Sequence, residues 1–136
     1  MIHISGKVIR GKRFGRVLGF PTANLDRRAF SRRRLTLPLG IYAGFAEFSL
    51  HAKKQRLKAA IVIGPIDNRG LPKIEAHVLN FSGNLYGTYI QLELVKFIRG
   101  WKNFKSIADL KKQISSDIQK TKHVLLKIAA AKKRSK

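Results

Sequence analysis

The stretch TYIQLELVKFIRGWKNFKSIADLKKQI, Thr88–Ile114, contains the point at which the hydrophobic pattern of this chain changes its period. Over 88–98 apolar and polar residues alternate, which indicates a β-strand with one buried face. Beyond Trp101 the apolar residues recur at helical spacing. We therefore predict a strand over 88–98 and then a helix. Ser106, with Asp109 three residues later, resembles the capping pair of a helix N-terminus.

The predicted helix has one apolar stripe, formed by Ile107, Leu110, Ile114, Ile118, Leu125 and Ile128. After this stripe, residues 129–136 read as a frayed basic end. Upstream, the pattern predicts strands over 1–10, 41–50, 59–64 and 73–81. It predicts a loop over 10–38 and polar turns over 51–58, 65–72 and 82–87.

The order of these elements decides the fold class. Five or six β segments come before one helix, and no helix separates the strands, so the sheet should be antiparallel. Closing it into a small barrel would remove its exposed edges. We therefore expect a mainly β domain over 1–136, with the C-terminal helix packed against the barrel.

Composition limits the class of protein. Of 136 residues, 44% are hydrophobic, which is enough for one folded core. The chain has no cysteine, which fits a reducing compartment. No apolar run reaches the ~20 residues needed to span a bilayer, and MIHISGKVIR lacks a signal-peptide core. We expect a cytoplasmic protein with no membrane partner.

Charge is the unusual feature. The chain has 29 Lys and Arg against 7 Asp and Glu, a net charge of +22. Such a protein attracts polyanions, including nucleic acids and nucleotides. A generally basic surface without a specific partner explains the charge equally well, so we expect nucleic-acid contact only through non-specific charge.

The segment GRVLGFPTANL, Gly15–Leu25, is the first candidate site. Gly15 and Gly19 allow backbone N–H groups to approach a phosphate, and Arg16 adds positive charge. Thr22 and Asn24 offer neutral oxygens that suit Mg²⁺. An ordinary loop, in which Thr and Asn bond to nearby backbone, explains these residues as well.

Glu75 in KIEAHVLNF is the second candidate. Alternation places Glu75, His77 and Leu79 on one face of the predicted strand. A carboxylate near a phosphate site can accept a hydroxyl proton as general base. The alternative is a surface glutamate beside Lys73. The sequence contains no P-loop motif and no dinucleotide-binding motif. The spacing of the four histidines does not match that of a metal site.

Taken together, GRVLGFPTANL, PLGIYAG, IEAHVLNFSGNLYG and IRGWKNFKSIADLKKQISSDI closely resemble the riboflavin kinase family, including the kinase module of bacterial bifunctional FAD synthetases. The similarity runs over about residues 4–124. It implies a six-stranded antiparallel Greek-key barrel with a C-terminal helix. It also implies transfer of the ATP γ-phosphate to the 5′-hydroxyl of riboflavin, which gives FMN.

The resemblance also implies roles for individual residues. Glu75 would be the catalytic base, and Thr22 and Asn24 would hold Mg²⁺, with Zn²⁺ or Mn²⁺ as alternatives. The nucleotide-binding residues would be Gly15, Arg16, Gly19, Phe20, Pro21, Thr22 and Asn24. The flavin-binding residues would be Arg99, Trp101 and Phe104, although a core position explains Phe104 equally well.

Two alternatives to this function stay open. Val62 stands where the family often has Asn, and Ile66 stands where it has Thr. These departures from the family pattern keep open a flavin-binding module with impaired catalysis. The basic charge of the chain keeps open a second alternative, a basic RNA-binding barrel. We expect a monomer or a part of a larger FAD synthetase chain.

Overall fold

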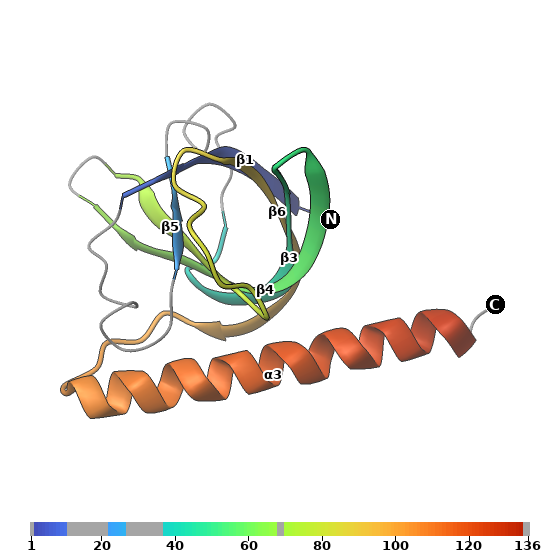
Figure 1. Ribbon diagram of the computed structural model, residues 1–136. Coiled ribbons are helices and arrows are strands. Elements are labelled where there is room, and N and C mark those ends of the chain that lie inside the picture. Colours follow the sequence, from blue (N-terminus) through green and yellow to red (C-terminus); the bar gives the residue numbers. More distant parts are fainter. Residues whose placement is uncertain (1, 11–21, 27–36, 68–69, 135–136) are drawn as a thin grey trace.

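In the described part of the chain, six strands close into a barrel and one long helix lies along its outside (Figure 1). The computed structural model describes residues 2–10, 22–26, 37–67 and 70–134. The elements are β1 (Ile2–Ile9), β2 (Ala23–Leu25), β3 (Gly40–Leu50), β4 (Lys53–Ile66), β5 (Pro72–Val78), β6 (Tyr89–Gly100) and α3 (Ile107–Arg134).

The strand order around the barrel is β1-β2-β5-β4-β3-β6, and neighbouring strands are antiparallel. Strands β3, β4 and β5 pair in succession, and β6 then returns to lie beside β3. This spatial order is a Greek key. The predicted fold class, a six-stranded antiparallel barrel with a C-terminal helix, is confirmed.

Alternating side chains fill the inside of the barrel. The largest of the fully buried hydrophobic ones are Ile4, Leu25, Ile61, Ile63, Ile74, Ile90 and Leu92. Because neighbouring residues of a strand point to opposite faces, the residues between them point outward. The core therefore fixes the register of the outward side chains, and these include the candidate catalytic residues.

Two expectations about the strands were wrong. The predicted loop over 10–38 contains β2, whose three residues are too few to show a period. The predicted turn over 51–58 is limited to His51 and Ala52, because β4 begins at Lys53 and pairs with β3 from Lys53 to Ile63. Both turn residues have positive φ, of 52° and 62°. Two-residue turns with positive φ usually contain Asn-Gly, and His-Ala stands in its place here, so the sequence does not indicate this turn.

Helix α3 begins as predicted. The Ser106 hydroxyl accepts a hydrogen bond from the Asp109 backbone N–H at 3.1 Å, which caps the first turn. Ile107 is 60% exposed, so the buried stripe begins at Leu110. The helix continues to Arg134, so the predicted frayed end is helical over 129–134.

The helix packs against β3, β4 and β6, and its C-terminal end extends past the barrel (Figure 1). Its buried face includes Asp117 and Thr121, which are only 4% and 0% exposed. Among the described residues, no helix has both the length and the apolar character required to cross a bilayer.

Candidate active site

A row of outward side chains crosses the barrel at the middle of β5. Glu75 on β5 pairs with Asn24 on β2 and with Val62 on β4. Directly opposed residues of an antiparallel pair have Cβ atoms about 5 Å apart. Thr22 lies two residues before Asn24, so the alternation that buries Ala23 turns Thr22 toward the same side. The barrel thus brings together three residues predicted from two separate motifs.

A cavity of about 480 Å³ lies between this wall of the barrel and the first half of α3. Its wall on the barrel side includes Thr22, Ile41, Val62, Glu75, His77 and Arg99. The loop before α3 contributes Trp101 and Phe104, and the helix contributes Leu110, Ile114 and Asp117. The lining is mostly apolar with a few polar groups, the usual character of a small-molecule site.

A second cavity, of about 590 Å³, lies against β2 and the end of β1. Asn24 and Arg10 line it from β2 and the end of β1, and Asn84 and Tyr86 line it from the turn after β5. Thr22 lines both cavities. The two spaces therefore adjoin at Thr22, beside the Asn24–Glu75 pair.

Burial raises the pKa of Glu75 above its ordinary value, while the positive charge of Lys73 opposes the shift. Loss of hydration at Glu75 therefore outweighs the positive charge nearby. A carboxylate with a raised pKa is a stronger base once it is ionised.

His77 follows Glu75 on the same face, as predicted, but it lies beneath the helix and is only 8% exposed. Burial lowers the pKa of His77 to about 4, although Asp117 opposes this shift. Its Nδ1 is buried and has no hydrogen-bond partner among the described residues. His77 is therefore a neutral part of the cavity wall near pH 7.

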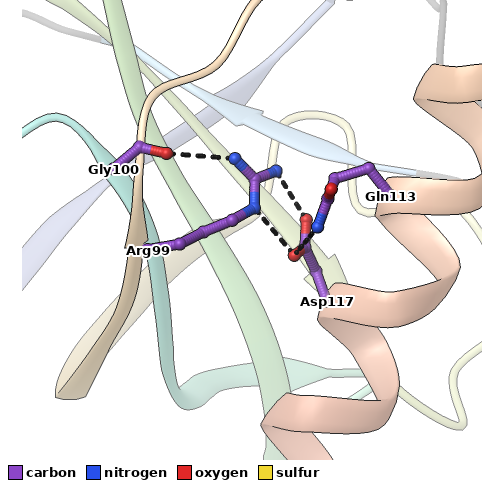
Figure 2. A network of polar contacts seen from close by, with 4 residues as sticks. All are labelled: Arg99, Gly100, Gln113 and Asp117. Atoms are coloured by element: carbon purple, nitrogen blue, oxygen red, sulfur yellow. Dashed lines mark hydrogen bonds and ion pairs between the residues drawn. The ribbon is translucent and has the colours of Figure 1, made fainter.

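Arg99 is held at the cavity by a carboxylate from the helix (Figure 2). Its Nε and Nη2 donate to the two Asp117 oxygens at 2.9 and 2.7 Å, and its Nη1 donates to the Gly100 carbonyl at 3.0 Å. The Gln113 amide also donates to Asp117, at 3.0 Å. This bidentate pair joins β6 to α3 and fixes the position of the guanidinium.

Two aromatic residues lie beside Arg99. Trp101 is 40% exposed, and its indole Nε1–H donates to Asn103 at 3.2 Å. The Arg99 guanidinium carbon lies 5.9 Å from the centre of the Phe104 ring. Both rings line the 480 Å³ cavity. Each is therefore available to contact a planar ligand there.

The structure thus brings Thr22, Glu75, Arg99, Trp101 and Phe104 to one cavity and places Asn24 opposite Glu75. The predicted residues Gly15, Arg16, Gly19, Phe20 and Pro21 lie outside the described residues. The sequence analysis missed Gln113 and Asp117. The signal was available: Gln113, Asp117 and Thr121 are polar residues four apart within the apolar stripe.

The donor set near Glu75 fits a magnesium ion that is shared with a substrate. A hydroxyl and an amide oxygen are the hard, neutral ligands that Mg²⁺ accepts, and it usually completes its shell with water and phosphate oxygens. In the described ranges, no cluster of three or more His, Cys, Asp or Glu residues could hold a metal alone. Thr22 and Asn24 would therefore hold the ion together with a bound phosphate.

Comparisons with known proteins agree with this geometry. A family model described as "Flavokinase: Riboflavin kinase" matches residues 1–125. A Bifunctional riboflavin kinase/FMN adenylyltransferase of Haemophilus influenzae is 33% identical over 128 residues, which cover 88% of this chain and 37% of the relative. The RNA-binding riboflavin kinase RibR of Bacillus subtilis is 33% identical over 123 residues, which cover 87% of this chain and 49% of the relative.

A solved structure supports the same relationship. The crystal structure of riboflavin kinase from Trypanosoma brucei matches with a TM-score of 0.70 and 26% identity, over 92% of this chain and 80% of that one. The chain spans less than half of the length of the two curated relatives, 37% and 49%.

Proposed function

Since this chain belongs to the riboflavin kinase family, we propose that it transfers the γ-phosphate of ATP to the 5′-hydroxyl of riboflavin and so forms FMN. One observation carries the proposal: two cavities, of about 590 and 480 Å³, adjoin at Thr22, beside the paired Asn24 and Glu75. Transfer between two substrates requires such adjoining sites, because the donor phosphate and the acceptor hydroxyl must meet in line.

In this proposal the 590 Å³ cavity takes the nucleotide and the 480 Å³ cavity takes the flavin. Asn24 lines the 590 Å³ cavity, Glu75 lines the 480 Å³ cavity, and Thr22 lines both. Mg²⁺ held by Thr22 and Asn24 would neutralise charge on the phosphates. Zn²⁺ and Mn²⁺ are alternatives with the same oxygen ligands. Gly15, Arg16, Gly19, Phe20 and Pro21 are proposed to contact the nucleotide.

Glu75 is the proposed general base. Its carboxylate would accept the proton of the ribityl 5′-hydroxyl as that oxygen attacks the phosphorus atom. The raised pKa of Glu75 brings it closer to the working pH, which favours proton transfer. Val62, its neighbour on β4, adds an apolar side chain to the same cavity and helps to keep the carboxylate poorly hydrated.

The flavin ring is proposed to lie against Trp101 and Phe104, with Arg99 at its polar edge. A guanidinium has five N–H donors, and three of those of Arg99 form hydrogen bonds within the described residues. The other two have no partner among those residues and would donate to a ligand carbonyl. The pair with Asp117 would hold the guanidinium in place before the ligand arrives.

The test is FMN formation from riboflavin, ATP and MgCl₂, followed by chromatography with fluorescence detection. We expect FMN that depends on both ATP and the metal, with none formed in excess EDTA. MnCl₂ and ZnCl₂ assays identify the preferred ion. If no metal supports FMN formation while riboflavin still binds tightly, the chain is instead a flavin-binding module with impaired catalysis.

The comparisons do not assign RNA binding to this chain. The matched region is 49% of the Bacillus subtilis relative, so the name of that protein does not say which part of it binds RNA. The intact set of Thr22, Asn24 and Glu75 favours the enzyme.

A further inference from the structure

The solvent face of α3 is unusual in its charge. The helix carries seven lysines and Arg134 against two aspartates, Asp109 and Asp117. Asp117 is buried and paired with Arg99, so it does not neutralise the outer face. Elsewhere, Glu47 and Glu93 are both paired with Arg56 on the barrel. Of the two helix carboxylates, only Asp109, in the first turn, lies on the exposed surface of the helix.

The geometry of the helix gathers three of these lysines into a line. Lys111, Lys122 and Lys133 are spaced by eleven residues. At about 100° per residue, eleven residues make three turns and about 20°, so the three lysines share one flank at intervals of about 16 Å. In the described part of the chain, no carboxylate forms an ion pair with any of them.

The residues around this line are small, neutral or basic, except for one aspartate in the first turn. The outward positions of the helix, opposite its buried stripe, are Ala108, Asp109, Lys111, Lys112, Ser115, Gln119, Lys122, His123, Leu126, Lys127, Ala129, Ala130 and Lys133. This set, the outer face of α3, has one carboxylate, Asp109, and none beyond the first turn. A face that serves only for solubility usually mixes both signs of charge.

We propose that the outer face of α3 binds the phosphodiester backbone of a nucleic acid. A line of lysines with small residues between them lets a phosphate chain lie close to the helix and releases its counterions. The end of the helix extends past the barrel, so a long polyanion can follow it without meeting the sheet (Figure 1). This function is additional to the proposed kinase activity and does not depend on it.

An anionic membrane is a poorer fit. A helix that lies in a membrane surface inserts an apolar face, but the apolar stripe of α3 is already packed against β3, β4 and β6. The outer face has one large apolar side chain, Leu126, which is 60% exposed. A nucleic-acid backbone, which the lysines can bind by charge without inserting apolar side chains, fits the outer face of α3 better.

The test is fluorescence anisotropy of the full chain with 5′-labelled 20-mers: single-stranded RNA, duplex RNA and duplex DNA, titrated from 50 to 300 mM NaCl without riboflavin or ATP. The helix variant is Lys111→Gln/Lys122→Gln/Lys133→Gln. The matched control is Lys7→Gln/Lys53→Gln/Lys54→Gln, which removes the same charge from exposed barrel positions. These positions lie on β1 and β4, and the hairpin end of β4 is apart from the helix (Figure 1).

We expect the helix variant to lose about 2 units of the slope of log K against log salt, and at least tenfold in affinity at 100 mM NaCl. The control should lose less than threefold. The three oligonucleotides distinguish RNA from DNA as the source of the phosphates. FMN formation should be the same in both variants and the wild type. If the helix variant misfolds, Lys111→Gln and Lys133→Gln alone should each lower the slope by about 0.7–0.9.

Equal losses in the two triple variants would overturn the proposal, because they would mean a diffuse charge effect. Absence of binding to all three oligonucleotides at 100 mM NaCl would also overturn it. So would binding to phosphatidylglycerol vesicles that exceeds binding to every oligonucleotide.

Discussion

The ion pair between Arg99 and Asp117 predicts a large and specific loss of stability when one partner is removed. The two side chains are 20% and 5% exposed, and two hydrogen bonds of 2.9 and 2.7 Å join them. Asp117→Leu would leave the guanidinium poorly hydrated and without its partner. Breaking a buried pair in this way costs about 3–5 kcal/mol, and the partial exposure of Arg99 places the loss near about 3 kcal/mol.

A double-mutant cycle separates this pair from simple packing. Arg99→Met/Asp117→Leu removes both charges, and we expect its stability to lie within about 1 kcal/mol of the wild type. The coupling energy, which is the difference between the double variant and the sum of the two single variants, should then be at least about 2 kcal/mol. Urea unfolding at pH 7 measures it: with an m-value of about 1–3 kcal/mol per M, Asp117→Leu should lower the midpoint by about 1–3 M.

A surface pair provides the control. Arg56 bonds to Glu47 and Glu93 at 2.8 and 2.6 Å, but its side chain is 44% exposed. Arg56→Met should therefore cost only about 1 kcal/mol or less. A loss below about 1 kcal/mol for Asp117→Leu, or a coupling energy near zero, would refute the reasoning that this pair fixes β6 against α3.

Two further predictions concern buried titratable groups. Burial lowers the pKa of His77 to about 4, so between pH 6.5 and pH 4 this histidine is protonated in the unfolded chain but not in the folded one. The free energy of unfolding therefore decreases as the pH is lowered through this range, by up to about 3 kcal/mol. His77→Gln should remove this part of the acid sensitivity, as measured by urea midpoints across that range; an unchanged pH profile would contradict it. Burial raises the pKa of Glu75, so wild-type stability falls as pH rises through that pKa. Glu75→Gln should be more stable than the wild type at pH 8, with the gain vanishing below pH 4; lower stability at pH 8 would contradict it.

The sequence predicted the elements whose pattern is long and periodic. The alternation in β6 and the apolar stripe of α3 are clear because many residues repeat them. Strand β2 has three residues and exists because β1 and β5 hold it on either side, which no local pattern reveals. The β3–β4 hairpin was misjudged because His51 and Ala52 adopt positive φ without glycine or asparagine.

The candidate site was predicted in part. Alternation alone placed Glu75 and His77 on one face, and the register then brought Asn24 opposite Glu75. Their pKa shifts were not predictable, because they come from burial that only packing creates. Asp117 stands out in the sequence as a polar residue within the apolar stripe, but its partner, Arg99, comes from another element that only the fold brings beside it.

The most direct test of the central claim is the rate of FMN formation by Glu75→Gln beside Glu93→Gln. Both substitutions remove one carboxylate charge from a barrel strand, but Glu93 pairs with Arg56 on the surface. If Glu75 is the base on the 5′-hydroxyl, Glu75→Gln should lower kcat by about 10²–10⁴ with little change in riboflavin affinity, and Glu93→Gln should stay within about twofold. A Glu75→Gln enzyme that keeps its full rate would contradict the account.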